Sequence, residues 1–515
     1  MIRLLIVTLL CAAQFLPATE FNWTPGEFGE ITELAGRHLL TVTVPDTARE
    51  KINCAETEIN LEPLRGLLVR FSVKVRARDV SRPRKPWNGI KVMLNYQEAF
   101  GKQYWHNVQN LSGSFAWRQA AFTTTISSTA AKGRVMLGLQ DSSGTAEFDL
   151  DSLEIRPLFP KSQSTYRMRY SESVNRTPPL RGFMSPFHTR REDLAALREW
   201  NANLLRVQIC RNWGKSNTDL DLAEYDRWID GKLDHLEQLL DPAHQLGIRI
   251  VIDLHSPPGG RDNERDMRMF YEEKYAEHFC RVWEKIARRF RGHPAVWAYD
   301  LLNEPSQKRP AKCNYFELQC RAARRVRTID PETPIIIEAN EWAAPSAFHY
   351  LPVLKMENII YEVHIYQPGA YTHQNVNNTY GEMGAAAVSV YPGIIQGELW
   401  NKEKLRQVLA PVRKFQKRHN ARIYVGEFSV VAWAPGAERH LRDNIELFEE
   451  YGWDWSYHSF REWKGWSLEH EGHDIHSMRP SSTNPRKSVI LEMLKRNTFR
   501  KLETGATGDK ADGTL

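Results

Sequence analysis

Two glutamates in this chain follow short apolar runs. Glu304 stands in the sequence Asp-Leu-Leu-Asn-Glu-Pro, and Glu427 stands in Ile-Tyr-Val-Gly-Glu-Phe. Such runs are typical of buried strands, so each carboxylate would lie where a strand gives way to a loop, the place where (β/α)8 barrels hold their catalytic groups. Two carboxylates on either side of one bond can hydrolyse a glycosidic linkage, one as proton donor and the other as nucleophile or base. The pair therefore indicates a hydrolase that acts on sugars.

The composition is that of an ordinary soluble protein with room for two or three domains. Its 515 residues are 42% hydrophobic and 26% charged. A net charge of +6 over this length is too small to indicate nucleic acid or an acidic partner. The 16 Trp, 18 Tyr and 21 Phe suggest sugar binding, because aromatic rings stack on the apolar faces of sugars. For any single ring, packing in the core is an equal alternative.

The N-terminal part differs from the rest. Residues 1–18 combine one positive charge, an apolar run and small residues, which is typical of a signal peptide and predicts a secreted protein. The run is too short to span a membrane. Residues 19–160 hold short β-rich runs separated by turns, which predict an all-β sandwich of the jelly-roll kind. The six cysteines less Cys11 leave five, an odd number that implies no disulfide framework.

Residues 161–500 change to apolar strands that alternate with amphipathic helices, a pattern that favours a parallel sheet covered by helices. Eight strand candidates make a (β/α)8 TIM barrel the simplest closure. We expect the tail, residues 501–515, to be disordered. The expected strands are residues 182–184, 204–209, 248–254, 295–302, 334–338, 359–364, 422–426 and 453–460.

In such a barrel the residues just past each strand meet at one mouth, so the polar side chains of the site can be named from the strand ends. They are Arg206, His255, Asn303, Glu304, Asn340, Trp342, His364, Tyr366, Glu427 and residues 461–463.

Taken in order along the chain, these residues resemble glycoside hydrolase family 5, the retaining cellulase family. The resemblance covers residues 181–467. It rests on Ala-Asn-Leu-Leu-Arg ending at Arg206, Asp-Leu-His ending at His255, Leu-Asn-Glu-Pro around Glu304, His-Ile-Tyr ending at Tyr366, and Gly-Glu-Phe around Glu427. The resemblance implies a barrel fold, with Glu304 as acid/base and Glu427 as nucleophile.

Physical chemistry supports these roles. A general acid must be protonated near neutral pH, and a nearby anionic Glu427 would favour the protonated form of Glu304. The nucleophile must stay ionised, which a charge-assisted hydrogen bond from Arg206 would favour. Tyr366 would orient Glu427, and Asn303 would donate to the sugar 2-hydroxyl. We expect His255 and His364 to bind substrate rather than to shuttle protons.

Aromatic side chains would supply the sugar platforms. Trp463 is the first candidate at the eighth strand and Trp466 the second. Trp342, Trp213 and Trp433 are candidates for flanking subsites, with core packing as an equal alternative. The long segment after Tyr366, up to about residue 399, is expected to border the cleft. The sandwich resembles a carbohydrate-binding module, although a structural role is nearly as open; its candidate aromatics are Trp87, Tyr96, Tyr104, Trp105 and Trp117.

Other signals are weaker. The histidines at 470, 473 and 476 have ligand-like spacing, but a solvated loop is the better interpretation, and we expect no metal and no cofactor. Asp300 is expected to make an inward structural hydrogen bond. The sequence as a whole predicts a monomeric retaining enzyme that cuts a β-1,4-glucan internally. A mannan or xyloglucan hydrolase and a catalytically idle carbohydrate-binding protein are the alternatives.

Overall fold

A computed structural model describes residues 21–98, 101, 103–376 and 388–499. The expected signal peptide, the expected tail and part of the segment after Tyr366 lie outside the described residues. The chain forms two compact units that divide between Gln163 and Ser164, close to the boundary expected at residues 160–161. None of the helices described is both long enough and apolar enough to cross a membrane.

The first unit is an antiparallel β-sandwich, as predicted. One sheet has the strand order β1-β2-β9-β4-β7 and the other β3-β8-β5-β6. Alternate residues of β2 face the core, where Leu40, Val42 and Val44 are buried. The strands are β1 Gly29–Leu34, β2 Arg37–Val44, β3 Ile52–Asn60, β4 Leu68–Val80, β5 Gly89–Gln97, β6 Gln103–Asn107, β7 Gly113–Thr125, β8 Lys132–Gln140 and β9 Gly144–Pro157.

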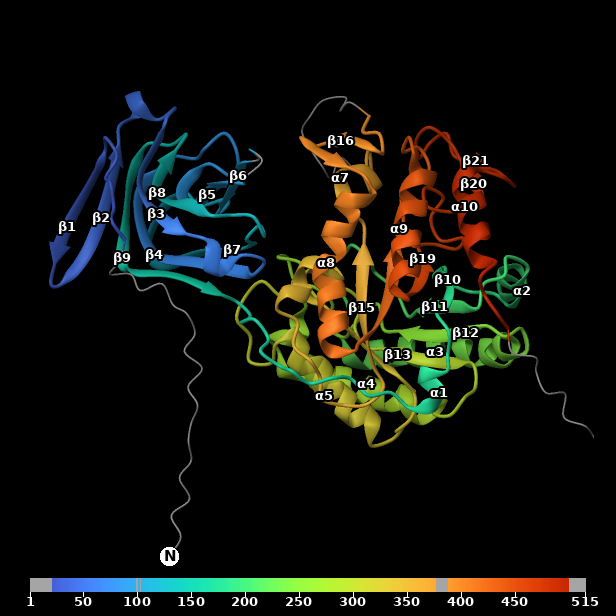
Figure 1. The fold of residues 1–515 in the computed structure, drawn as a ribbon. Helices are drawn as coiled ribbons and strands as arrows, with labels where there is room; N and C mark the ends of the chain where they lie inside the picture. Colours follow the sequence, from blue (N-terminus) through green and yellow to red (C-terminus); the bar gives the residue numbers. More distant parts are fainter. Residues whose placement is uncertain (1–20, 99–100, 102, 377–387, 500–515) are drawn as a thin grey trace, which may run out of the picture. The chain divides into compact units, whose positions relative to one another are not determined.

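The second unit contains a closed parallel barrel of eight strands, in the order in which they occur along the chain (Figure 1). All eight predicted strands are present; five are shorter than expected, and β10, β15 and β18 are longer. They are β10 Arg181–Met184, β11 Leu204–Gln208, β12 Arg249–Asp253, β13 Val296–Asp300, β14 Ile335–Glu338, β15 Ile359–Ile365, β18 Arg422–Phe428 and β19 Asp454–Tyr457.

Helices follow most of these strands and cover the outside of the barrel (Figure 1). After β14 the covering element is reduced to a short turn, α6 Asn340–Ala343, and the 3-10 helix η5 Pro345–His349. After β15 come α7 Gly369–Thr372 and a hairpin of β16 Gly393–Ile395 and β17 Glu398–Trp400. The principal helices are α2 Arg191–Glu199, α3 Leu222–Gln245, α4 Glu273–Phe290, α5 Tyr315–Arg327, α8 Lys402–His419, α9 Ala437–Tyr451 and α10 Pro485–Leu494.

The barrel interior is layered. An apolar cluster of inward-facing side chains fills it, and on five strands a charged residue follows two positions later. Because strand side chains alternate between faces, a residue two positions on points into the same interior, one layer nearer the carboxyl end. The pairs are Leu204 with Arg206, Val251 with Asp253, Ala298 with Asp300, Ile336 with Glu338, and Ile360 with Glu362.

A β-bulge brings the nucleophile candidate into this charged layer. Tyr424 faces inward, so in a regular strand Gly426 would be the next inward residue. The register between β15 and β18 shifts after Val363, which pairs His364 with Glu427 instead. Gly426 has no side chain to place, and a Cβ there would overlap Oε1 of Glu362. The bulge and the glycine together turn Glu427 inward.

Substitution of Gly426 by Ala is expected to lower the free energy of unfolding by about 1–3 kcal/mol, because the new methyl group would be forced into an occupied space. Gly231→Ala is the matched control, since this glycine lies inside α3 with no heavy atom near the added Cβ. The control should be neutral or stabilising by up to about 1 kcal/mol. Urea unfolding of both variants measures the difference. Equal stability of the two variants would contradict the bulge argument.

Candidate active site

Arg206 lies at the centre of the charged layer. Its guanidinium group is fully buried and has five carboxylates within ion-pair distance. It also donates to Oδ1 of Asn303 at 3.0 Å. The carboxylate oxygens lie at 3.2 Å for Asp253, 2.6 Å for Asp300, 3.0 Å for Glu338, 3.4 Å for Glu362 and 2.8 Å for Glu427.

Arg206 alone does not balance five anions, and burial favours the protonated form of some of these carboxyl groups. Burial, followed by the Glu362 charge, raises the pKa of Asp300 and of Glu338 well above the ordinary range. Oδ1 of Asp300 has no hydrogen-bond partner in the described structure, so it has room for that proton. Asp300 therefore makes the inward structural contact expected of it.

Glu427 is the carboxylate that stays ionised. Arg206 donates to Oε1 at 2.8 Å, Tyr366 donates to Oε2 at 2.9 Å, and Nδ1 of His458 lies 3.1 Å from Oε2. Burial opposes ionisation, but the positive charges of His364, His458 and Arg206 hold the pKa of Glu427 well below its usual range. The expected contacts of Arg206 and Tyr366 with this residue are both present.

Glu304 is held differently. It lies on the loop after β13 in a left-handed backbone conformation, with φ of 50°. Its N–H donates to Oε2 of Glu338 at 2.7 Å, and its carbonyl accepts from Arg261 at 2.8 Å. Left-handed backbone is strained for a residue with a side chain, so these two main-chain hydrogen bonds stabilise the conformation that aims the carboxyl group inward. Its Oε1 lies 3.0 Å from Nδ1 of His364.

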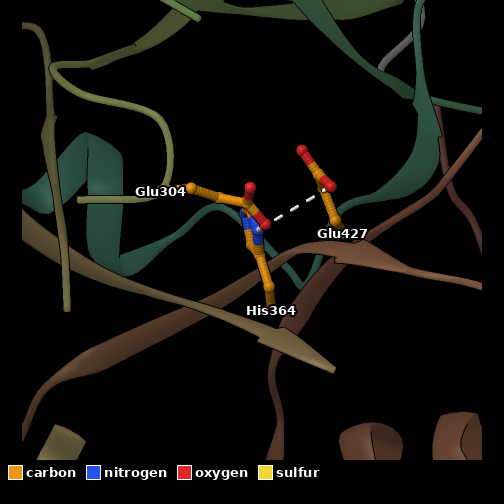
Figure 2. A group of neighbouring side chains, drawn as sticks. All are labelled: Glu304, His364 and Glu427. Carbon is orange, nitrogen blue, oxygen red and sulfur yellow. Dashed lines mark hydrogen bonds and ion pairs between the residues drawn. The ribbon is translucent and has the colours of Figure 1, made fainter. Parts of the chain in front are cut away.

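His364 joins the two glutamates (Figure 2). Its Nδ1 lies 3.0 Å from Glu304 and 3.7 Å from Glu427, and its Nε2 lies 3.0 Å from Glu362. Burial disfavours the imidazolium, but Glu427, Glu338 and the hydrogen-bonded carboxylates outweigh it and raise the pKa of His364 well above the ordinary value. Oxygens of Glu304 and Glu427 lie within 4.8 Å of each other.

His255 holds Asn303. Its Nδ1 lies 2.8 Å from Asp253, and its Nε2 lies 3.1 Å from Nδ2 of Asn303. Both ring nitrogens of His255 are thus engaged by protein groups, as are those of His364. The geometry favours a positioning role for both histidines over the substrate contact that was expected of them. The second N–H of the Asn303 amide stays free of these contacts.

One residue at the site, His458, was missed by the sequence analysis. His458 is the first residue after β19 and lies against Glu427, while its Nε2 lies 2.7 Å from Glu462. The expected strand ran on to Phe460, so the polar residue at the true strand end was hidden inside it. Burial disfavours the charged ring, but Glu462 and Glu427 raise the pKa of His458 to about 9.

Trp466, rather than Trp463, packs on the nucleophile's partners. Its ring lies 4.4 Å from His458 and stacks at 5.6 Å on Tyr366, measured between ring centroids. Trp463 lies one ring further out, edge-on to Trp466 at 5.3 Å and to Trp433 at 6.0 Å. The three tryptophans form a continuous aromatic wall that begins at the nucleophile.

A second aromatic group flanks Glu304. Trp342 lies edge-on to Trp213 at 6.5 Å, and the Arg261 guanidinium lies 4.2 Å from the Trp342 ring centroid. Trp213 is 45% exposed and lies 4.7 Å from His255. These tryptophans are therefore at the site, on the acid/base side of it.

Other predicted residues have different neighbours. Asn340 accepts from the N–H of Gln307, and Arg461 pairs with Glu469, so both make structural contacts. From the segment after Tyr366, the ring of His373 packs on Tyr366 at 5.0 Å, which places the described start of that segment beside the site.

The three side chains in Figure 2 offer ligand atoms close enough for a metal ion. A histidine ligand must be neutral, however. Both nitrogens of His364 face carboxylates, and its pKa is raised well above the ordinary value. The ring is therefore a cation within this network, and its chemistry does not fit a metal ligand.

This chain resembles known proteins in sequence and in structure. The sequence model of the family described as Cellulase (glycosyl hydrolase family 5) matches residues 168–469. Endoglucanase C of Acetivibrio thermocellus is 28% identical over an alignment of 265 residues that covers 47% of this chain and 76% of the relative. Cellodextrinase A of Ruminococcus flavefaciens is 24% identical over an alignment of 253 residues that covers 47% of this chain and 69% of the relative. Among solved structures, Cel5A of Thermotoga maritima with cellobiose aligns over 61% of this chain and 96% of its own, with 21% identity and a TM-score of 0.48.

Replacement of Arg206 by Met is expected to cost about 3–5 kcal/mol of stability near pH 7, because it leaves buried carboxylates without a cation. Without the guanidinium the folded-state pKa of Glu427 would rise above its unfolded value, and the pKa values of Asp300 and Glu338, which are already raised, would rise further. That cost is present above the unfolded pKa and disappears below it, so the loss should shrink as the pH falls toward about 4. Urea unfolding of wild type and variant at both pH values measures it. A loss that did not change with pH would contradict the charge argument.

Proposed function

Because the chain belongs to glycosyl hydrolase family 5, the cellulase family, we propose that this glycoside hydrolase cleaves internal β-1,4 linkages of a glucan with retention of configuration. The observation that carries the proposal is the approach of the Glu304 and Glu427 oxygens to within 4.8 Å. Carboxyl groups about 5 Å apart leave no room for a water molecule between one of them and the sugar, which favours direct attack by a carboxylate. An inverting enzyme needs a wider separation.

In the first step, Oε2 or Oε1 of Glu427 attacks the anomeric carbon while Glu304 gives its proton to the departing glycosidic oxygen. Arg206, Tyr366 and His458 hold Glu427 ionised and pointed at the sugar. The electrons of the cleaved bond leave with the glycosidic oxygen, and a glycosyl ester of Glu427 remains.

In the second step, Glu304 takes a proton from water, and the water oxygen attacks the anomeric carbon and releases Glu427. Esterification has removed the Glu427 charge, so Glu304 can now be the anion of the pair. His364 contacts both carboxyl groups and can follow the negative charge from one to the other. Asn303 would present its free amide N–H to the sugar 2-hydroxyl, a contact that strengthens in the transition state.

The glucan and the internal cut are proposed from the relatives, since Endoglucanase C of Acetivibrio thermocellus spans 47% of this chain at 28% identity. The aromatic wall of Trp466, Trp463 and Trp433 would bind successive sugar rings by stacking. A polymer does not enter a cell intact, so we place the enzyme's action outside the cytoplasm, in agreement with the signal peptide expected at residues 1–18.

The roles of the two glutamates can be distinguished by the activity of their variants on substrates with different leaving groups. Glu304→Ala should lose about a thousandfold or more in kcat on a natural glucan but retain much of its glycosylation rate on a dinitrophenyl β-cellobioside, whose leaving group needs no proton. Glu427→Ala should be inactive on both substrates, because no carboxylate remains to attack. Release of dinitrophenolate and of reducing ends measures the two rates. Equal losses for both variants on both substrates would contradict the assigned roles.

The substrate is tested with soluble β-1,4-glucan, mannan and xyloglucan, by reducing-end release together with viscosity. The proposal expects glucan to be cut fastest and its viscosity to fall early, because internal cuts shorten a polymer quickly. Faster cutting of mannan or xyloglucan would overturn the assignment of glucan as the substrate but would leave the assignment as a glycosidase in place. Absence of release from every β-glycan would support the alternative of an idle binding protein.

We also propose that the sandwich binds a glycan on its four-stranded sheet. Trp105 on β6 is 50% exposed and pairs in register with Asn95 on β5. Asn95 pairs with Arg134 on β8, and Arg134 with Glu58 on β3. Directly paired residues share a sheet face, so these side chains form a row about 15 Å long across the strands. Asn95 is 3% exposed and forms the floor of the row, while Trp105, Arg134 and Glu58 are exposed and would contact a sugar chain lying along it.

The matched control for this row is Trp117, which is 40% exposed on β7 of the other sheet. Trp105→Ala in the full chain should release the protein from insoluble glucan, with retention reduced about tenfold, since aromatic stacking is worth about 1 kcal/mol or more. Trp117→Ala should leave retention unchanged. Sedimentation with the polysaccharide measures both. Equal retention of the two variants would favour a structural sandwich.

A further inference from the structure

His458 contacts the nucleophile and, at the same time, the tyrosine that donates to the nucleophile. Its Nδ1 lies 3.1 Å from Oε2 of Glu427 and 2.5 Å from the Tyr366 hydroxyl. Its Nε2 lies 2.7 Å from Glu462, whose only partner in the described structure is this ring. The Tyr366 hydroxyl and His458 thus meet the same carboxylate oxygen of Glu427 from two elements.

The protonation of His458 decides which way the Tyr366 hydroxyl points. A tyrosine hydroxyl has one proton to donate. When Tyr366 gives it to Glu427, Nδ1 of His458 faces only acceptors, and its Nε2 faces the Glu462 carboxylate, so both ring nitrogens must carry protons. When Nδ1 loses its proton it becomes an acceptor 2.5 Å from the same hydroxyl, and it competes with Glu427 for the Tyr366 proton.

We propose that His458, held by Glu462, is a positioning residue whose imidazolium form directs the Tyr366 hydroxyl onto the nucleophile Glu427, and whose deprotonation turns that hydroxyl away. The inference rests on the proposed double displacement, for which Glu427 must be anionic. It adds an alkaline limit to the reaction that is set by a His–Glu pair and not by the acid/base Glu304.

The surroundings of His458 support the charged form in the resting enzyme. The titratable groups that face it are Glu427 from β18, Glu462 from its own loop, and Tyr366 and His373 from the segment after β15. Burial disfavours the charged ring, but the two carboxylates raise the pKa of His458 to about 9. Burial and the nearby His458 lower the pKa of His373 to about 4, so His373 is neutral and adds no competing charge.

The two carboxylates act at different stages. In the glycosyl-enzyme, Glu427 is an ester and no longer attracts the ring, so Glu462 alone keeps His458 charged. The positive charge then remains beside Oε2 when water releases the carboxylate, and it stabilises the negative charge that returns there. Removal of Glu462 should therefore be felt most in the second step.

The test compares Glu462→Gln and His458→Gln with the control Glu492→Gln, which alters an exposed carboxylate of α10 paired with Arg442 of α9. The pH dependence of kcat/KM is measured on a soluble β-1,4-glucan. Glu462→Gln should move the alkaline limb about 1–2 pH units lower, because the ring loses an adjacent negative charge. His458→Gln should lose that limb and about ten- to a hundredfold in kcat/KM at neutral pH. The control should match wild type.

His364 also titrates beside Glu427, and Glu462 makes no contact with it, so a limb that moves in Glu462→Gln belongs to His458. If the limb stays at the wild-type pH in both variants, the proposal is overturned, and His364 or another group sets it. A burst of product release that appears only in Glu462→Gln, with an aryl cellobioside, would support slow release of Glu427. If the initial rate of product release in Glu462→Gln equals its steady-state rate, then Glu462 does not act mainly in the second step.

A readout without substrate separates this proposal from the proposed function. Titration of the full chain with labelled imidazole nitrogens, followed by NMR, should show one histidine that is missing in His458→Gln and titrates near pH 9. It should titrate lower in Glu462→Gln. If wild type cuts no glycan but shows this titration, the proposed glycosidase reaction is wrong, and the proposed control of the Tyr366 hydroxyl by His458 still stands. If His458 is neutral at pH 7, the proposed role of its imidazolium form is wrong, whatever activity the enzyme shows.

Discussion

Arg206 is the constraint on which the site depends. A guanidinium group with no exposure to water stands among the carboxyl groups of Asp253, Asp300, Glu338, Glu362 and Glu427, which come from five other strands of the barrel. A buried ion pair is not in itself a large source of stability, but a buried charge that has lost its partner is costly. Each carboxyl group is therefore tied to one geometry, and the barrel cannot change its register without breaking the arrangement.

This charged layer makes the two glutamates unlike each other. Glu427 receives the positive charge of Arg206 directly, with Tyr366 and His458 on its second oxygen. In the described structure Glu338 and Arg261 hydrogen-bond to the main chain of Glu304, and His364 lies against its carboxyl group. One carboxyl group is fixed as an anion, while the other is fixed in place and left free to exchange a proton. That difference is what a double displacement needs from a pair of identical side chains.

Much of this arrangement could be predicted from the sequence. The eight strands follow from their apolar runs, and the polar residues at or just past the carboxyl ends of these strands gave Arg206, Asn303, Glu304, Tyr366 and Glu427. Arg206 and Glu427 lie inside β11 and β18, not beyond them. The roles of the histidines were harder, although a signal was present. Asp253 and His255 are two residues apart, as are Glu362 and His364, and residues so spaced on a strand share a face. Each histidine therefore meets its own carboxylate before it can meet a substrate.

Other features could not be predicted from the sequence because they depend on strand ends, loop paths and the pairing of strands. β19 ends at Tyr457, but aromatic residues recur as far as Phe460, so the expected strand extended over His458. The choice between Trp463 and Trp466 depends on the path of the loop that follows, and no periodicity describes a loop. The bulge at Gly426 is likewise a matter of pairing between two strands, since it is the register with β15 that turns Glu427 inward.

The most direct test of the account is to trap the covalent intermediate. A 2-deoxy-2-fluoro-β-cellobioside with an activated leaving group slows both steps but slows the second more, so a glycosyl-enzyme should accumulate. Mass spectrometry of the digested protein should find the sugar on the peptide that contains Glu427, in an ester at that side chain. A sugar attached to Glu304, or turnover with inversion and no adduct, would contradict the assignment of Glu427 as the nucleophile.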